Sequence, residues 1–263
     1  MKTRLDCYLV ENGLAGSRER ARALIMAGKV RVNGRLADKA GFPVPEGASV
    51  SVVGGALPYV SRGGFKLEKA LRTFPIDLKG RVAADIGAST GGFTDCMLQN
   101  GARRVYAVDV GYGQLDWRLR SDERVVTLER RNARFMEPAW FEDGPFSFAS
   151  IDVSFISLRL ILPPLHACLP EGGEAVALIK PQFEAGRAEV GKRGVVRDPA
   201  VHRRVCEESV RFAVETGFSA LGLCPSPIKG PEGNIEFLLW IMKETPPRPA
   251  NLNIGAAIDE AHN

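Results

Sequence analysis

A short apolar strand runs directly into a glycine-rich turn at Val82-Ala83-Ala84-Asp85-Ile86-Gly87-Ala88-Ser89-Thr90-Gly91-Gly92-Phe93. Residues 82–86 have the length and apolar character of a buried strand, and we expect a helix from the glycines to about residue 100. Only one glycine precedes the three-residue gap, so the spacing does not match GxGxxG and argues against a nicotinamide cofactor. The stretch predicts one strand-turn-helix unit of an α/β sheet.

Strands and helices continue to alternate on both sides of this unit. Helices are expected at 65–73, 158–168 and 199–215, and six further strands at 105–110, 125–128, 146–152, 175–180, 220–224 and 236–242. Seven strands interleaved with helices predict a doubly wound α/β sheet. The last strand is rich in Phe, Leu, Trp and Ile, and it is the candidate for the antiparallel strand found in many such sheets.

The first 53 residues predict a separate small α+β domain. Ser17 is a good N-cap for a helix, and Asn33-Gly34 has the composition of a type I′ hairpin turn. Two helices, a hairpin and a closing strand are expected at 4–12, 18–27, 29–36 and 50–53. We therefore expect this domain at 1–53, a linker at 54–61, the α/β domain at 62–244 and a loose tail at 245–263.

The net positive charge is concentrated in the first third of the chain. Residues 1–81 carry 15 Lys and Arg against 7 Asp and Glu, whereas residues 82–263 carry 20 against 24. Such an asymmetry is typical of a protein that binds a polyanion, usually nucleic acid. A basic lobe without a partner would explain the charge alone equally well.

The composition is that of an ordinary globular protein, with 45% hydrophobic and 25% charged residues among 263. No apolar run approaches the ~18 residues of a membrane span, and the N-terminus lacks a secretory pattern. The five cysteines are scattered and form no CxxC pair, which argues against a zinc site or a disulfide framework. These features predict a protein of the reducing cytoplasm with no stable membrane association and no bound metal.

Two aspartates at predicted strand ends indicate a nucleoside-containing ligand. Ligands of open α/β sheets bind beyond the carboxyl ends of the strands, where Asp85 and Asp109 fall. An acid in the position of Asp109 can accept hydrogen bonds from both ribose hydroxyls of an adenosine. Together with tight glycines and no phosphate-binding pattern, this set fits S-adenosylmethionine. If the glycines served only a tight turn, both aspartates would be unexplained.

The predicted cofactor site also includes a turn at 132–134, which is expected to border the adenine. Its candidate residues are Asp85, Gly87, Ser89, Thr90, Gly91, Gly92, Phe93, Asp109, Asn132 and Asp152. Four charged residues are expected at the same rim: Lys66, Asp152, Lys180 and Glu236. Taken singly, such residues are most often surface charges, but Asp152 and Lys180 each follow an apolar strand. A proline directly after Lys180 ends its strand at the rim.

In order and context, these four residues match the Lys-Asp-Lys-Glu tetrad of FtsJ-like ribose methyltransferases. The chain to about residue 244 resembles the TlyA family, through the blocks YVSRGGFKL, DIGASTGGFTDC, AVDVGYGQL, IDVSFISL, LIKPQFE and GPEGNIEFL. Members of that family are known both as hemolysins and as 2′-O-methyltransferases of cytidines in ribosomal RNA. The resemblance implies a seven-stranded Rossmann-like methyltransferase fold, S-adenosylmethionine as the methyl donor, and ribosomal RNA or a ribosomal subunit as the partner.

Residues 4–53 resemble the small RNA-binding domain named after ribosomal protein S-four. The resemblance rests on the helix cap, the glycine that ends the helix and the hairpin GKVRVNG, which occur in register. It implies that Arg18, Arg22, Lys29, Arg31 and Arg35 contact RNA phosphates. Further candidate RNA-binding residues are Arg4 and, at the rim of the α/β domain, Arg62. The alternative is a solvated charged face.

The resemblance also implies chemical roles for the tetrad. A ribose 2′-hydroxyl is a weak nucleophile, so it must lose its proton as it attacks the methyl group. We expect Lys180 to be the base, with a pKa lowered by the second lysine and by partial burial. Asp152 is expected to orient Lys180 near the methyl donor, Lys66 to tune the charge and steer the hydroxyl, and Glu236 to position Lys66 or the substrate.

Three other functions are weighed against this one. A membrane-lytic protein needs long amphipathic or apolar segments that can leave the fold, whereas the apolar segments here are short and serve as strands. An RNA-binding module with an inactive α/β domain would not need an intact tetrad. A dehydrogenase would need a different glycine spacing. No oligomeric state is predicted.

Overall fold

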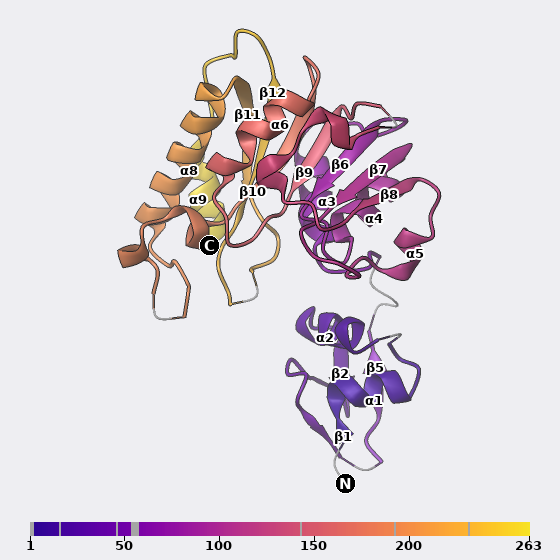
Figure 1. The fold of residues 1–263 in the computed structure, drawn as a ribbon. Helices are drawn as coiled ribbons and strands as arrows, with labels where there is room; N and C mark the ends of the chain where they lie inside the picture. The colour runs from indigo at the N-terminus through magenta and orange to yellow at the C-terminus, as the bar shows by residue number, and fades with distance from the viewer. Residues whose placement is uncertain are drawn as a thin grey trace. The chain divides into compact units, whose positions relative to one another are not determined.

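The computed structural model describes residues 3–15, 17–45, 47–53, 58–142, 144–191, 193–230 and 232–263. Its contacts divide the chain into two compact units, Met1–Arg62 and Gly63–Asn263. The elements of both units are labelled in Figure 1. Residues 54–57 of the predicted linker lie outside the described part of the chain.

The first unit combines a helix pair with short strands. Its helices are α1 (Leu5–Glu11) and α2 (Arg18–Met26), and its strands are β1 (Thr3–Arg4), β2 (Val30–Val32), β3 (Arg35–Leu36), β4 (Pro43–Val44) and β5 (Val50–Val52). β2 lies between β3 and β5 in an antiparallel sheet, and β1 pairs with β4. Ser17 caps α2 by accepting a hydrogen bond from the backbone of Arg20. Asn33 and Gly34 have φ of 48° and 76°, as a type I′ turn requires.

The second unit is built on a seven-stranded sheet in the order β11-β12-β10-β9-β6-β7-β8. The strands are β6 (Val82–Ile86), β7 (Arg104–Val108), β8 (Val125–Leu128), β9 (Phe148–Ile151), β10 (Glu174–Ile179), β11 (Phe218–Pro225) and β12 (Phe237–Lys243). In this described sheet, β12 runs opposite to the other six strands. The predicted seven-stranded α/β fold and its antiparallel last strand are confirmed.

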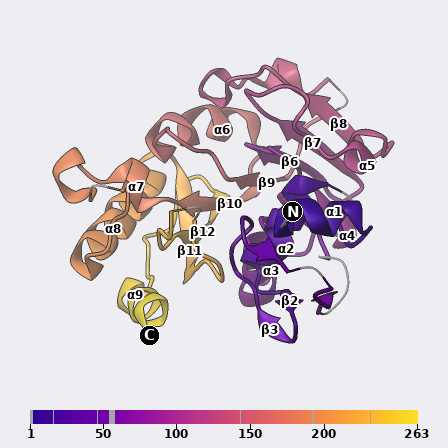
Figure 2. The same ribbon diagram turned by 90° about the horizontal axis from the view of Figure 1, so that it is seen from below.

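The helices of this unit connect and cover the strands, as Figures 1 and 2 show. They are α3 (Gly64–Thr73), α4 (Gly92–Gln99), α5 (Trp117–Arg120), α6 (Leu162–Cys168), α7 (Pro181–Glu184), α8 (Pro199–Glu215) and α9 (Ile254–His262), with 3₁₀ turns η1 (Ala133–Phe135), η2 (Pro138–Trp140), η3 (Leu158–Leu160) and η4 (Arg187–Glu189). The helix expected at 158–168 is divided into η3 and α6, because two prolines there suit the first turn of a new helix. Over the described ranges, no helix has both the length and the apolarity needed to cross a membrane.

The end of the chain differs from the loose tail expected over 245–263. Residues 254–262 form α9, which packs against α8 and β11. Ala257 and Ile258 are buried, and Asn253 caps the helix by accepting a hydrogen bond from the backbone of Ala256. Apolar residues at helical spacing therefore give this segment one face that packs into the unit.

Candidate active site

The carboxyl ends of the central strands border a cavity of about 490 Å³. Five predicted cofactor-binding residues line it: Gly87, Ser89, Asp109, Asn132 and Asp152. Gly87 has φ of 88°, and a Cβ there would lie 2.7 Å from the backbone oxygen of Asp152. Only glycine therefore allows the ends of β6 and β9 to approach this closely.

Asp109 ties two loops together at the cavity wall. Its Oδ2 accepts a hydrogen bond from the backbone of Ser89 at 2.7 Å, and its Oδ1 accepts one from Gly111 at 2.6 Å. Asn132 accepts a hydrogen bond from the backbone of Arg134 at 3.1 Å and caps η1. Both side chains are thus fixed in place by the loops that carry them.

Asp85 lies near the carboxyl end of β6, two residues before Gly87, and it is fully buried. Thr94 donates to Oδ2 from its backbone at 2.9 Å and from its hydroxyl at 2.7 Å, while the Ser150 hydroxyl donates to Oδ1 at 3.0 Å. Burial raises the pKa of Asp85 to about 6, although the hydrogen bonds from Thr94 and Ser150 act in the opposite direction. Asp85 therefore joins α4 to β9.

The other four residues predicted to bind the cofactor are not among those that line the cavity. Gly91 has φ of 93° and starts α4, and a Cβ there would overlap the side chain of Leu119. Gly92 and Phe93 are buried in the first turn of α4, and Thr90 lies just before it. These residues shape the turn that follows β6.

Four charged side chains meet at the same edge of the sheet: Lys66 on α3, Asp152 after β9, Lys180 after β10 and Glu236 before β12. Asp152 is shared by the two lysines, with its Oδ1 2.5 Å from Lys180 Nζ and its Oδ2 3.2 Å from Lys66 Nζ. Lys66 Nζ also lies 2.9 Å from Glu236 Oε2. The structure thus brings together all four residues of the predicted tetrad.

The sheet topology explains this convergence. The parallel strands β9 and β10 end at one edge, so the residues that follow them, Asp152 and Lys180, are neighbours. β12 runs the opposite way and pairs its first residue, Phe237, with Ile179 at the end of β10. The residue before an antiparallel strand therefore reaches the same edge as the residues that follow the parallel strands.

The cluster is largely buried and formally neutral, with two ammonium groups and two carboxylates. Lys66 and Lys180 are each 7% exposed, and Glu236 is 2% exposed. Burial lowers the pKa of Lys66, but the charges of Asp152 and Glu236 outweigh this effect and raise it above its ordinary value. Burial raises the pKa of Asp152, but the two lysines outweigh this and lower it. Asp152 is therefore ionised and Lys66 is a firmly held ammonium group.

Sequence reasoning missed other polar groups that support this cluster. The Ser154 hydroxyl accepts a hydrogen bond from Lys180 Nζ at 2.9 Å, and Gln182 Nε2 donates to Glu236 Oε1 at 3.4 Å. Glu184 on α7 accepts hydrogen bonds from the Ser157 hydroxyl and the Leu158 backbone, which tie α7 to the loop after β9. The only signal in the sequence was that these residues lie within a few positions of Asp152 or Lys180 along the chain.

Phe155 stands out at the mouth of the cavity. It lines the cavity, is 91% exposed and has φ of 63°. Its ring lies 5.1 Å from that of Phe183, between centroids. A bulky residue with positive φ is rare, and such strain concentrates at functional sites. The pair presents an aromatic surface close to Lys180.

The predicted RNA-binding residues of the first unit fall into three groups. Arg4, Arg18 and Arg22 all contact the buried carboxylate of Asp6. Arg31 and Arg35 are exposed on the hairpin, whereas Lys29 and Arg62 are half-buried. In β2, Val30 and Val32 are buried and Arg31 between them is exposed.

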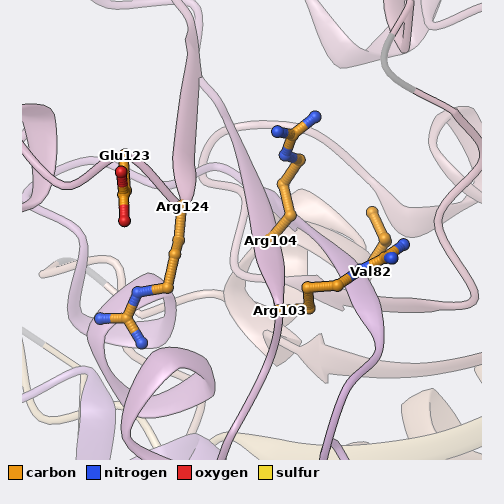
Figure 3. Close-up of a pocket in the computed structure, with 5 residues that line it drawn as sticks. All are labelled: Val82, Arg103, Arg104, Glu123 and Arg124. Atoms are coloured by element: carbon orange, nitrogen blue, oxygen red, sulfur yellow. The ribbon is translucent and has the colours of Figure 1, made fainter.

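A second hollow, of about 410 Å³, lies at the opposite edge of the sheet, where β6, β7 and β8 begin. Its lining residues are Val82, Arg103, Arg104, Glu123 and Arg124. Figure 3 shows the three guanidinium groups pointing in different directions, and Arg124 is already paired with Asp122 at 2.7 Å. These cations do not converge on one ligand, so the candidate active site is the cavity beside the tetrad.

Comparisons with known proteins agree with this geometry. Residues 59–243 match the FtsJ-like methyltransferase family, and residues 3–50 match the S4 domain. The YqxC protein of Bacillus subtilis is 57% identical over 91% of this chain and 85% of its own length. The 16S/23S rRNA (cytidine-2'-O)-methyltransferase TlyA of Mycobacterium tuberculosis is 46% identical over 93% of this chain and 91% of its own.

A solved structure extends the match to the whole fold. A Streptococcus thermophilus protein described as a hemolysin shares 50% identity with this chain at a TM-score of 0.79, over 99% of this chain and 96% of that one. The family matches together cover both units of the molecule. The chain therefore belongs to the TlyA family, as an FtsJ-like methyltransferase with an amino-terminal S4 domain.

Proposed function

We propose that this chain transfers a methyl group from S-adenosylmethionine to the 2′-hydroxyl of a cytidine in ribosomal RNA. The observation that carries the proposal is the buried, neutral cluster of two lysines and two carboxylates at the edge of the 490 Å³ cavity. The named activity of the Mycobacterium tuberculosis relative supports the choice of ribosomal cytidine as the target. An inactive α/β domain would have no use for this arrangement of charges.

The cavity wall fits the cofactor by its chemistry. Each carboxylate oxygen of Asp109 keeps a lone pair beyond its backbone hydrogen bond, and these can accept from the two hydroxyls of a ribose. Val110, Ala133 and Ile156 supply apolar wall for a purine, and Asn132 supplies a polar edge. When bound, S-adenosylmethionine supplies a methyl group on a cationic sulfur, which is open to attack by an oxygen nucleophile.

The chain's own part in the reaction is to remove the hydroxyl proton. Lys66 has two carboxylate partners, whereas Lys180 contacts one carboxylate among the described residues. Lys180 is therefore held by fewer carboxylates than Lys66, and we assign it as the base. Asp152 and Ser154 fix its Nζ in position, and general-base help of this kind contributes ~10²–10⁴-fold.

The aromatic surface beside Lys180 suits the nucleobase of the target. An RNA base that is taken out of its stack is commonly held on aromatic side chains. Phe155 offers an exposed ring at the cavity mouth, and Phe183 supports it. The S4 domain supplies the basic residues that would hold the surrounding RNA.

The test is methyl transfer from labelled S-adenosylmethionine to purified large and small ribosomal subunits that lack the modification. The labelled RNA is digested to nucleosides, and the methylated positions are mapped. We expect label in 2′-O-methylcytidine of at least one subunit. Label on a base atom, or no label on either subunit and their free RNA, would contradict the proposal.

A further inference from the structure

In the first unit, three arginines surround one buried carboxylate. Asp6 is fully buried near the start of α1 and accepts five hydrogen bonds. Oδ1 accepts from Arg4 Nε at 3.0 Å and from the Cys7 backbone at 3.1 Å. Oδ2 accepts from Arg4 Nη2 at 3.1 Å, from Arg18 Nη2 at 3.1 Å and from Arg22 Nε at 3.3 Å. One side chain thus sets the position of three guanidinium groups from two segments.

The arginines face water although the aspartate does not. The side chains of Arg4, Arg18 and Arg22 are 53%, 51% and 49% exposed. The hydrogen bond from Arg4, followed by those from Arg18 and Arg22, holds the pKa of Asp6 far below its ordinary value, against the opposing effect of burial. Asp6 therefore keeps its charge, and the cluster of Asp6 with these arginines has a net charge of +2.

A net charge of +2 in so small a cluster has a physical consequence. Three guanidinium groups that share one carboxylate repel one another, and one arginine would suffice to pair Asp6. An anion at the outer side of the cluster relieves this repulsion, and guanidinium forks match the geometry of a phosphate. Because Asp6 already fixes the forks, little side-chain entropy is lost on binding.

We propose that Asp6 is a positioning residue for RNA, which pre-organises Arg4, Arg18 and Arg22 into a site for backbone phosphate. The inference rests on the proposed function, since it takes RNA as the partner of the S4 domain. It adds a role for a buried acidic residue inside a basic surface. The arginines bind by their arrangement as well as by their charge.

The test is the affinity of the full chain for ribosomal RNA, measured with the variant Asp6→Asn over a range of salt concentrations. This change removes a negative charge, so charge alone predicts tighter binding. Pre-organisation predicts the opposite: the affinity for RNA should be lower by roughly tenfold. The slope of log affinity against log salt concentration should be shallower by about one. Glu19→Gln is the matched control, because it removes the same charge from an exposed position on α2. The control should bind as tightly as the wild type or more tightly.

A second variant decides the matter if Asp6→Asn disturbs the fold. Arg4→Lys keeps the charge but loses the fork that contacts both oxygens of Asp6, and its half-exposed position is tolerant of change. We expect it also to weaken RNA binding, with thermal unfolding and S-adenosylmethionine binding unchanged. Wild-type protein that neither binds nor methylates ribosomal RNA would contradict the proposed function. Wild-type binding that is kept or strengthened in Arg4→Lys and in folded Asp6→Asn would overturn this inference alone.

Discussion

Each unit of the molecule contains a cluster of cations that share one aspartate, and the two clusters differ in their cation and in their exposure. Asp152 holds two buried lysines, whereas Asp6 holds three arginines that are about half exposed. With Glu236 the lysine cluster is neutral, while the arginine cluster has a net charge of +2. Lysine can give up its proton in a protein and arginine cannot. The buried neutral cluster suits proton transfer, and the exposed cationic cluster suits a polyanion.

Of all the substitutions, removal of Lys180 is expected to change the activity most. Lys180→Ala should lower methyl transfer by at least ~100-fold, because the hydroxyl loses its base. S-adenosylmethionine binding, measured by calorimetric titration, should change little. Lys69→Ala is the matched control, since Lys69 lies on α3, the helix that carries Lys66, but pairs with Glu260 outside the tetrad. Equal losses in both variants would show that the effect is not specific to the cluster.

Asp85 is a third case for comparison, because this buried carboxylate has only neutral hydrogen-bond donors among the described residues. Its pKa of about 6 means that the folded state keeps a proton that the unfolded state releases near pH 4. Stability should therefore fall as pH rises from about 4 to about 6, by on the order of 2 kcal/mol from this group.

Asp85→Asn should remove that decline. Denaturant unfolding followed by tryptophan fluorescence reports on the second unit, which contains all three tryptophans, at positions 117, 140 and 240. The free energy of unfolding of the wild type should decrease relative to the variant between pH 4 and pH 6. Parallel curves over that range would show that Asp85 does not titrate there.

The sequence predicted the sheet and the tetrad because both depend on local patterns. Each apolar strand is continuous in sequence, and Asp152 and Lys180 directly follow two of them. The support from Ser154, the burial of Asp6 and the docking of α9 depend on contacts between distant segments. Single-sequence patterns do not reveal such contacts, and an aspartate in a basic helical segment looks like a surface charge.

The same reasoning explains why some of the predicted cofactor residues line the cavity and others do not. The glycine-rich turn could be predicted as a unit, but only part of it faces the cavity. Gly87 and Ser89 lie before the left-handed turn at Gly91, and Phe93 lies after it, in the core. Which residues face the cavity is set by the turn into α4, where a Cβ on Gly91 would overlap the side chain of Leu119.

A smaller effect is expected at the cavity wall. Asp109→Ala should weaken S-adenosylmethionine binding by tenfold or more, because hydrogen bonds to a charged group contribute roughly 1.5–3 kcal/mol. Calorimetric titration measures this directly. Asp122→Ala serves as the control, since Asp122 pairs with Arg124 at the far edge of the sheet. Unchanged affinity in Asp109→Ala would remove this residue from the cofactor site.

The smallest effect is expected at the hydroxyl that holds the base. Ser154→Ala removes the hydrogen bond that Lys180 Nζ donates to the Ser154 hydroxyl, which is worth about 1 kcal/mol, so kcat should fall several-fold. Ser154→Thr keeps the hydroxyl and should recover much of the rate. Single-turnover methyl transfer at saturating RNA separates this loss from RNA binding. A threonine variant as slow as the alanine variant would indicate a packing defect.

The most direct measurement is the rate of methyl transfer by Lys180→Arg, compared with Lys180→Ala and the wild type. Arginine keeps the positive charge beside Asp152 but cannot take a proton from the ribose hydroxyl. If the lysine cluster differs from the arginine cluster because it supplies a base, Lys180→Arg should be as inactive as Lys180→Ala while both still bind S-adenosylmethionine. A Lys180→Arg variant that retains a large share of the wild-type rate would show that Lys180 acts only through its charge.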